Sequence, residues 1–457
     1  MPGNNKRRMK KVLVIAYAFP PMSYAGVFRT LKFCKYLPEF DWQPLVLTIK
    51  ETRYHKKDYS LIDQIPKDVT VYRTPTIDPA MWYNHRPQLK KIHFRGNGEI
   101  DEETNKKSDS TREGKYIEKI KRFLFNAATF PDHMIFWIPF AVIKGIKISV
   151  KEKPDIIYVS SPPHSSHFIG LILSFIFRKP LVADFRDPWM DNDYLLGLLR
   201  SKLQKKKSMW LESLIINNAT RVILNTNTNR NAVLRRYQSL NKEKLIVLTN
   251  GFDGDDVKDI ETKENKKFTI TFIGSIYPYF KTDLFFDGLK LWIEKLESKD
   301  ISSRFQVLFI GSKNTTVETM VQERNISNVI SFIDYLPKKK ALGICLSSNL
   351  LLIMLGFNKD SKRIIPSKLF DYFLCKKPIL AIVPDGEAAQ LIRKTKTGYI
   401  VSEDDPCVME RTIASKYKQF IENGTLDYSP DRRIVEQYSI LSLTKRLSSV
   451  FNEIKTT

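Results

Sequence analysis

Short runs of apolar residues recur along this chain, and a segment long enough for a helix separates most of them. Residues 11–17, K-V-L-V-I-A-Y, form a continuous β-rich run of the kind that is buried on both faces of a parallel sheet. The alternation of strand and helix restarts at residue 268, after a polar, charged segment. Because 457 residues exceed what one hydrophobic core usually supports, the pattern predicts two α/β domains, each a doubly wound parallel sheet.

The predicted strands fall into two groups. The first group comprises residues 11–17, 45–49, 156–159, 181–184, 221–225 and 245–248, and the second comprises residues 268–273, 305–310, 329–333, 350–355 and 379–383. In the first group, a loop of residues 19–26 follows the opening strand, at the carboxyl end where open α/β sheets bind ligands. Gly26 closes this loop and lets a ligand approach the backbone. The loop lacks the G-x-G-x-x-G fingerprint, which argues against a dinucleotide.

The stretch of residues 364–384 predicts a short helix followed by a buried strand. Ser367 is placed to cap the helix, and Lys368 lies beside its N-terminus. Unpaired backbone N–H groups and the positive end of the helix dipole make this a site for a phosphate or diphosphate. Asp371, one turn further on, is placed to accept hydrogen bonds from a ribose. On local pattern alone, an ordinary helix and strand of an α/β layer is the simpler explanation.

Polar residues also follow two strands of the first group, in the sequences S-S-P-P-H and D-F-R-D-P-W. We expect His164 from the first and Asp184, Arg186 and Asp187 from the second to converge on one rim of the sheet. A structural role is possible for each: a strand-end histidine bonded to backbone, an Arg186–Asp187 pair that braces the loop, and an aspartate that fixes it. For Asp184 this structural role is favoured over that of a base.

The formal net charge of +24 indicates an anionic partner: nucleic acid, a phosphorylated substrate or an acidic membrane face. No nucleic-acid-binding module is recognisable, so nucleic acid is not expected. The run of Lys205, Lys206 and Lys207 is either a solvated face or, beside Trp210 and Leu211, a contact with lipid.

The predicted location is the cytoplasm, with the protein bound peripherally to the inner face of the cell membrane. No targeting segment is visible, and no uninterrupted apolar run reaches the ~20 residues that span a bilayer. Residues 123–146 come nearest but are interrupted by Asp132, His133 and two prolines. The four cysteines show no paired spacing, which indicates a reducing compartment and argues against a zinc site.

The composition also suggests boundaries. We expect an N-terminal domain over residues 1–250 with a mobile insertion at about 93–115, which is polar and nearly free of apolar residues. Residues 250–267 read as a linker, residues 266–428 as the second domain, and residues 429–457 as a helical tail.

Seven motifs, in order, resemble glycosyltransferase family 4, a group of GT-B enzymes that build bacterial surface polysaccharides. They are F-P-P-x-x-x-x-G-x-x-R, P-D-x-x-x-x-W, S-S-P-P-H, D-F-R-D-P-W, N-G-F-D, F-I-G-S and P-S-K-L-F-D-Y-x-x-x-x-K-P-I-L. The resemblance implies two Rossmann-like domains facing a central cleft, with a nucleotide sugar on the second domain and a saccharide or lipid-linked acceptor on the first. It also implies sugar transfer with retention of anomeric configuration, and a tail that crosses back to the first domain.

The resemblance assigns roles to individual residues. It implies that His164 points at the transferred sugar and that the donor side includes Gly26, Gly274, Ser275, Lys281, Pro366, Ser367, Lys368 and Asp371. From their position at a strand end on the same rim as His164, we add Arg186 and Asp187 to the catalytic side. Arg363, which replaces a family glutamate, is added to the donor side as a candidate to neutralise the diphosphate. A loose, oxocarbenium-like transition state needs stabilisation of the departing diphosphate, which Lys281, Lys368 and backbone N–H groups can give without a metal ion or other cofactor.

Three departures from the family pattern leave the donor open. Asp371 stands where a longer glutamate is common, Arg363 where the family has its other glutamate, and Ser275 where an arginine is common. Diphosphate neutralisation then falls to Lys281, Arg363 or Arg186. Two other functions remain compatible with the fold: a nucleotide-sugar epimerase or hydrolase, and a non-catalytic saccharide-binding protein.

Overall fold

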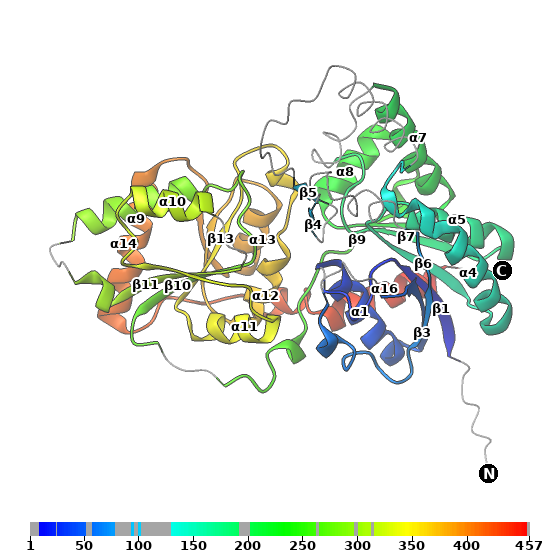
Figure 1. Cartoon of the computed structure of the whole chain (residues 1–457), viewed down its shortest axis with the longest axis horizontal. Helices are drawn as coiled ribbons and strands as arrows, with labels where there is room; N and C mark the ends of the chain where they lie inside the picture. Colours follow the sequence, from blue (N-terminus) through cyan, green and yellow to red (C-terminus); the bar gives the residue numbers. More distant parts are fainter. Residues whose placement is uncertain are drawn as a thin grey trace, which may run out of the picture. The chain divides into compact units, whose positions relative to one another are not determined.

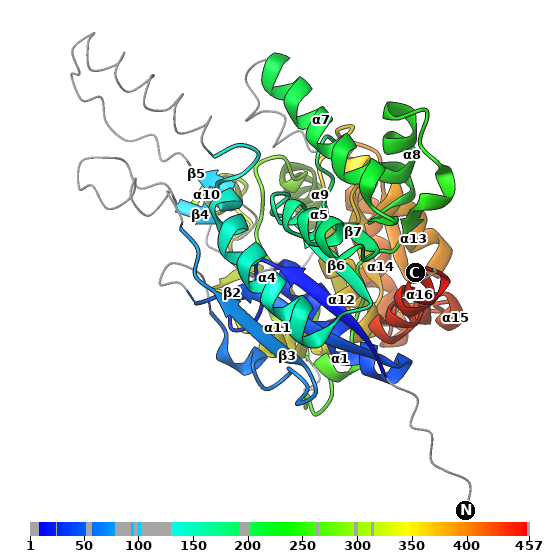
Figure 2. The same ribbon diagram turned by 90° about the vertical axis from the view of Figure 1, so that its right-hand side faces the viewer.

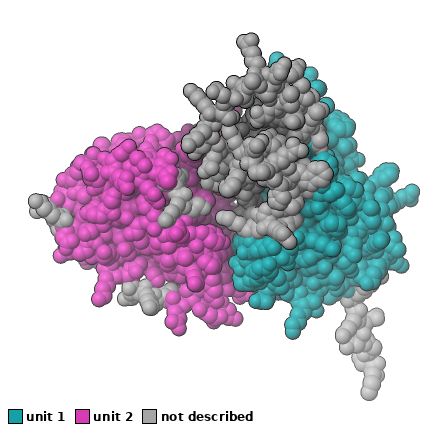
Figure 3. Space-filling view, viewed as in Figure 1, with its two compact units in different colours: residues 1–249, 444–457 teal, residues 250–443 magenta. Residues whose placement is uncertain are grey.

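A computed structural model of the chain describes residues 9–23, 25–51, 57–77, 93–95, 99–101, 129–191, 202–261, 265–296, 300–311 and 315–454. The chain divides into two compact units (Figure 3). Unit 1 consists of residues 1–249 together with 444–457, and unit 2 of residues 250–443. Residues 444–457, which belong to the segment predicted as a helical tail crossing back to the first domain, are grouped with unit 1.

A seven-stranded parallel sheet runs through unit 1 in the order β3-β2-β1-β6-β7-β8-β9 (Figure 1). Its strands are β1 (Lys10–Ala16), β2 (Trp42–Ile49), β3 (Thr70–Thr74), β6 (Ile156–Ser161), β7 (Leu181–Phe185), β8 (Arg221–Leu224) and β9 (Leu245–Val247). The strand order reverses between β1 and β6, which pair directly. Ligands of open α/β sheets bind at the carboxyl ends of the strands beside such a reversal.

Helices cover both faces of the unit 1 sheet. They are α1 (Ala25–Tyr36), α4 (Ile138–Glu152), α5 (Ser166–Phe177), α7 (Lys202–Asn218), α8 (Asn227–Arg236) and α16 (Ile440–Glu453), with short 3-10 turns at Leu37–Phe40, Tyr59–Leu61, His133–Trp137 and Lys242–Lys244. Helices α4, α5 and α7 form one layer (Figure 2), and α1 and α16 lie on the opposite face. Phe451 of α16 packs edge-on against Trp42 at 5.2 Å between ring centroids, so the end of the chain is part of the unit 1 core.

Unit 2 repeats the pattern with a six-stranded parallel sheet in the order β12-β11-β10-β13-β14-β15. The strands are β10 (Phe268–Ile273), β11 (Phe305–Ile310), β12 (Ile330–Ile333), β13 (Leu350–Met354), β14 (Ile379–Ile382) and β15 (Gly398–Val401). The helices are α9 (Thr282–Glu294), α10 (Thr315–Glu323), α11 (Lys338–Ser347), α12 (Ser367–Cys375), α13 (Glu387–Thr395), α14 (Pro406–Asn423) and α15 (Arg432–Glu436), with 3-10 turns at Gly254–Asp256, Ile301–Ser303 and Ser361–Arg363. Here the order reverses between β10 and β13. The predicted fold class, two doubly wound parallel sheets, is therefore confirmed.

Two local predictions are wrong. The segment predicted as a linker starts inside unit 2, because Phe252 is buried against Phe373 and exchanges backbone hydrogen bonds with Tyr438 and Ile440. Ser367 does not cap α12. Pro366 is the N-cap, in extended conformation, and it makes no side-chain capping hydrogen bond.

Two further segments, the predicted insertion and the apolar run that starts at His133, bear on the predictions. Within the predicted insertion, β4 (His93–Arg95) and β5 (Glu99–Asp101) pair as antiparallel strands, and its other residues lie outside the described ranges. The run His133–Glu152 is 20 residues long and, by length and composition alone, apolar enough to cross a membrane. His133 and Pro139 were predicted to interrupt this apolar run, but the 3-10 turn His133–Trp137 continues directly into α4, which packs against β2, β3 and α5.

Candidate functional site

In unit 2, two loops meet at the carboxyl edge where the strand order reverses. The loop after β10 begins with Gly274, whose φ of +101° strongly favours glycine. A Cβ atom at Gly274 would lie 3.3 Å from Nζ of Lys368, at the start of α12. The glycine loop and the N-terminus of α12 therefore lie against each other, as the sequence placed them.

Tyr372 holds α12 in this position; it is the tyrosine of the seventh motif, and the sequence analysis gave it no role. Its hydroxyl accepts a hydrogen bond from the backbone N–H of Ile273, at 3.2 Å, and donates one to the carbonyl of Leu352, at 3.1 Å. One buried side chain thus ties the helix to β10 and β13 together. The N–H groups of the first turn of α12 are kept at the sheet edge as a consequence.

The ammonium group of Lys368 rests on aromatic rings and not on a carboxylate. Its Nζ lies 3.7 Å from the centroid of the Phe272 ring and 5.9 Å from that of Phe280. Among the described residues it has no ion-pair partner. Burial lowers the pKa of Lys368 to about 7, although the charges of Asp371 and Cys345 act in the opposite direction. An anion bound here would supply the missing negative charge.

Asp371, predicted to hold a ribose, is engaged by a lysine that the sequence analysis missed. Nζ of Lys338 lies 2.8 Å from Oδ1 of Asp371 and 2.9 Å from Oδ2 of Asp256. Burial lowers the pKa of Lys338, but the two carboxylates outweigh it and leave this pKa above its ordinary value. The only available signal was the run of three lysines that opens α11, which resembles an ordinary solvated face.

The other predicted donor-side residues of unit 2 come from loops on the same edge. Lys281 caps α9, and its Nζ lies 2.6 Å from Oδ2 of Asp404, in the loop after β15. Arg363 ends the 3-10 turn between β13 and α12, and Ser275 follows Gly274. Asp404 therefore already neutralises part of the charge that Lys281 could offer to a diphosphate.

In unit 1, Arg186 covers Gly26. A Cβ atom at Gly26 would lie 1.4 Å from Nη1 of Arg186, so the guanidinium occupies the space that any larger residue would need. Arg186 also pairs with Asp187 at 3.3 Å, the bracing interaction that the sequence left open. Gly26 was predicted to lie against the donor diphosphate. In this structure the guanidinium of Arg186, a cation, lies against it.

His164 lies beside this arginine, stacked on Trp189 with 4.8 Å between centroids and 6° between planes. Its Nδ1 lies 3.2 Å from Oγ of Ser161, and its buried Nε2 has no hydrogen-bond partner within the described part of the chain. Burial, reinforced by the charge of Arg186, lowers the pKa of His164 to about 3. The imidazole is therefore neutral at physiological pH, with one nitrogen unsatisfied.

Asp184 is structural. The buried carboxylate accepts two hydrogen bonds from the guanidinium of Arg29, at 2.8 and 3.1 Å, and one from the hydroxyl of Tyr158. Arg29 also donates to the carbonyls of Leu248 and Thr249. The arginine of the first motif and the aspartate of the fourth thus join α1, β6, β7 and the segment after β9, as the structural alternative for Asp184 anticipated.

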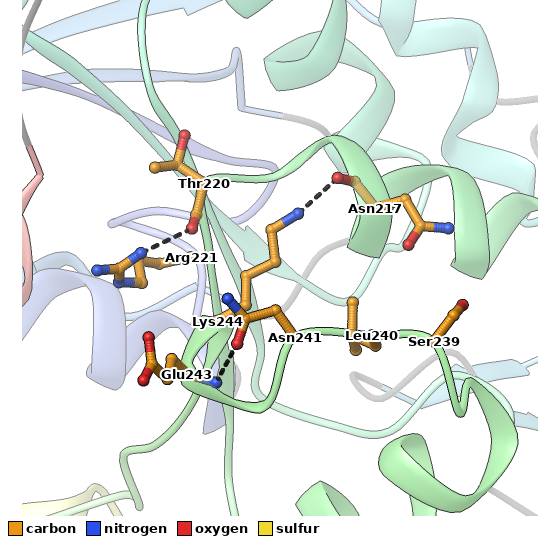
Figure 4. Close-up of a pocket in the computed structure, with 8 residues that line it drawn as sticks. All are labelled: Asn217, Thr220, Arg221, Ser239, Leu240, Asn241, Glu243 and Lys244. Atoms are coloured by element: carbon orange, nitrogen blue, oxygen red, sulfur yellow. Dashed lines mark hydrogen bonds between the residues drawn. The ribbon is translucent and has the colours of Figure 1, made fainter.

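One pocket lies away from these loops (Figure 4). It has a volume of about 330 Å³ and lies at the amino ends of β8 and β9. Its lining residues are Asn217, Thr220, Arg221, Ser239, Leu240, Asn241, Glu243 and Lys244. Nζ of Lys244 donates to the carbonyl of Asn217 at 2.5 Å, and burial, with the charge of Arg221, lowers the pKa of this lysine. No predicted site residue lines the pocket. In the described ranges, no group of three or more His, Cys, Asp or Glu side chains is arranged to hold a metal ion.

Comparison with known proteins agrees with the motifs. Residues 104–256 match the model of Glycosyltransferase Family 4. The structure of HepE from Anabaena in complex with UDP and glucose is 14% identical over 97% of this chain and 100% of its own, with a TM-score of 0.58. A glycosyltransferase from Rickettsia africae is 12% identical over 97% of this chain and 98% of its own, with a TM-score of 0.61.

TarM from S. aureus, in complex with Fondaparinux, alpha-GlcNAc-glycerol and UDP, is 12% identical over 97% of this chain and 100% of its own, with a TM-score of 0.53. The comparison with curated proteins gave no match. The recognised likeness to glycosyltransferase family 4 is confirmed over residues 104–256, and the GT-B fold is confirmed over the chain. The roles assigned to single residues stay predictions.

Proposed function

We propose that this protein is a glycosyltransferase that binds a nucleotide sugar on unit 2 and transfers the sugar to an acceptor. The observation that carries the proposal is the ammonium of Lys368, which lies beside Gly274 and the uncapped first turn of α12 without an anionic partner in the described chain. The titles of similar structures support it, since HepE was solved with UDP-glucose and TarM with UDP.

The diphosphate of the donor binds at the N-terminus of α12. Backbone N–H groups of the first turn and the charge of Lys368 stabilise negative charge there, and they do so most strongly when the diphosphate departs. Asp371 accepts hydrogen bonds from the ribose while Lys338 holds its other oxygen. No metal ion takes part, because the lysine and the helix supply the stabilisation.

His164 acts as a hydrogen-bonding group and not as a proton acceptor. An imidazole with a pKa of about 3 stays neutral, and its unsatisfied Nε2 is suited to a hydroxyl of the transferred sugar. Arg186 and Asp187 hold the loop beside it, and the arginine presents positive charge over Gly26.

Transfer proceeds with retention of anomeric configuration, as the resemblance to family 4 implies. The acceptor is a lipid-linked saccharide in the biosynthesis of a bacterial surface polysaccharide, and the protein works at the inner face of the cell membrane. Two observations support this part: the net charge of +24, and the similar fold of WaaG, a glycosyltransferase involved in lipopolysaccharide biosynthesis.

A thermal-shift screen with nucleotide sugars tests the donor without knowledge of the acceptor. We expect one nucleotide sugar to raise the melting temperature, and product with unchanged anomeric configuration to form only when an acceptor is added, with or without EDTA. Consumption of the donor without an acceptor would indicate the epimerase or hydrolase instead. Binding without any turnover would indicate a saccharide-binding protein.

A further inference from the structure

Helix α5 in unit 1 has an apolar outer face. Its sequence, S-H-F-I-G-L-I-L-S-F-I-F, contains no lysine, arginine, aspartate or glutamate. Ile169 and Leu173 are fully buried, while Phe175 on the outer side is 86% exposed and Ile176 is 48% exposed. A helix that covers a sheet in water normally carries polar residues on its outer side. The outer side of α5 therefore lacks the charged residues that are expected on a helix face in contact with water.

The neighbouring helices extend this apolar surface. Helix α5 packs against α4 on one side and α7 on the other, in the layer seen in Figure 2. Helix α4 exposes Ile143 and Val150, and α7 exposes Leu203, Met209 and Trp210. We call the outward surface of these three helices the α4–α5–α7 face. Several exposed apolar side chains on three helices that pack side by side indicate a site of interaction.

Positive charge surrounds the apolar side chains. The basic residues on the three helices and directly after α5 are Lys144, Lys147, Lys151, Arg178, Lys179, Lys202, Lys205, Lys206 and Lys207. The acidic residues of the three helices are Glu152 and Glu212. Glu152 binds Lys11 and Tyr72 and pairs with Lys151 of the same helix at 3.6 Å, and the buried Glu212 binds Arg236 and Tyr237. The cations of this face are therefore largely unneutralised.

The combination of apolar and basic groups on this face favours one binding partner, an anionic bilayer, over another, a second copy of the chain. A second copy of this chain would bring the same cations against these cations, and their repulsion opposes a symmetric dimer through this face. An anionic bilayer offers negative headgroups to the lysines and an apolar interior to Phe175 and Trp210. We infer that the α4–α5–α7 face docks on an anionic lipid bilayer, with Phe175 and Ile176 entering the boundary between headgroups and acyl chains.

The link between membrane docking and a lipid-linked acceptor rests on the proposed function. The docking itself does not depend on that function. It relocates the lipid contact predicted from the sequence, which lay at Lys205, Lys206 and Lys207 with Trp210 and Leu211. Leu211 is only partly exposed, and the most exposed apolar side chain of the layer belongs to α5. Helix α7 carries four of the nine basic residues of this face, more than either of the other two helices.

Co-sedimentation of the full chain with vesicles tests the inference. We expect binding to vesicles that contain phosphatidylglycerol, little binding to pure phosphatidylcholine, and weaker binding as salt is added. Phe175→Ser with Ile176→Ser should lower the partition coefficient at least about tenfold. Ile421→Ser, at an exposed position on α14 of unit 2, is the matched apolar control and should bind like the wild type.

The contribution of positive charge is tested with two double variants, one on this face and one control on unit 2. Lys206→Glu with Lys207→Glu should lower binding at low salt about tenfold or more, since each basic residue near an anionic surface contributes to attraction. Lys394→Glu with Lys418→Glu, at exposed positions of unit 2, should lower it much less. Equal loss in both pairs would show that net charge alone governs binding and would overturn the assignment to this face.

Fluorescence quenching provides a second test that does not depend on variants that could fold poorly. Phe175→Trp keeps an apolar side chain, and its fluorescence should be quenched by brominated acyl chains beyond the quenching seen in the wild type. No added quenching would overturn the inference, as would a concentration-dependent dimer that Phe175→Ser abolishes. Nucleotide binding measured on the same variants separates this outcome from a failure of the proposed function, because unit 2 is unchanged in the α5 and α7 variants.

Discussion

Binding of a nucleotide sugar should be coupled to proton uptake by Lys368. The free protein holds the pKa of this lysine at about 7, below its ordinary value of 10.5. A diphosphate at the N-terminus of α12 favours the charged form and so raises this pKa in the complex. The bound lysine then carries a proton over a pH range in which the free lysine has lost it.

The magnitude follows from the two pKa values. With a free pKa of about 7, roughly nine tenths of the lysine is neutral at pH 8, so binding takes up about 0.9 proton there and about 0.1 proton at pH 6. Affinity falls as pH rises above the free pKa, by up to about tenfold per unit, until the pKa of the complex is reached.

Isothermal titration calorimetry in buffers of different ionisation enthalpy measures the proton number directly. UDP-glucose suits the assay because its doubly esterified diphosphate does not titrate in this range. Lys368→Arg should bind with little proton uptake, since arginine stays charged. A wild-type proton number near zero at pH 8, with binding intact, would refute the reasoning.

Further substitutions test other contacts. Asp371→Asn should weaken donor binding and Asp371→Glu preserve or improve it, by calorimetry; equal affinities in all three proteins would show that this side chain is no ligand. Gly26→Ala should displace the guanidinium of Arg186 with little loss of unfolding free energy, because the atoms that the new Cβ would meet are the far end of a flexible side chain; a loss of about 3 kcal/mol or more in denaturant melts would contradict this. Asp184→Asn should lower stability by about 3 to 5 kcal/mol, because it leaves Arg29 buried without a counter-charge; a change below about 1 kcal/mol would contradict that role.

The sequence predicts the fold well because buried parallel strands leave continuous apolar runs. Residues 379–383 were recognised in this way, and the helix before them was placed with the right end at the sheet edge. The site is harder to predict because its contacts join distant parts of the chain. Lys338 meets Asp371 across 33 positions, and Arg186 meets Gly26 across a much longer span. No local periodicity reports such pairs.

The capping of α12 shows a different limit. A serine after a proline is a common start of a helix, and the sequence does not say which of the two residues is the last non-helical one. The structure gives that position to Pro366, whose side chain has no group that can bond to the first turn. The misplaced cap and the anion site are connected, because the uncapped N–H groups are those offered to a diphosphate.

The most direct test of the account is calorimetric titration of UDP into the wild type, Lys368→Ala and Lys394→Ala at pH 6.5. Lys394 lies exposed on α13 in the same unit and serves as the control for loss of one positive charge. We predict that Lys368→Ala weakens UDP binding by about 1 to 3 kcal/mol, the range for hydrogen bonds to charged groups, and that Lys394→Ala changes it little. Equal affinity of all three proteins for UDP would contradict the placement of the diphosphate at the N-terminus of α12.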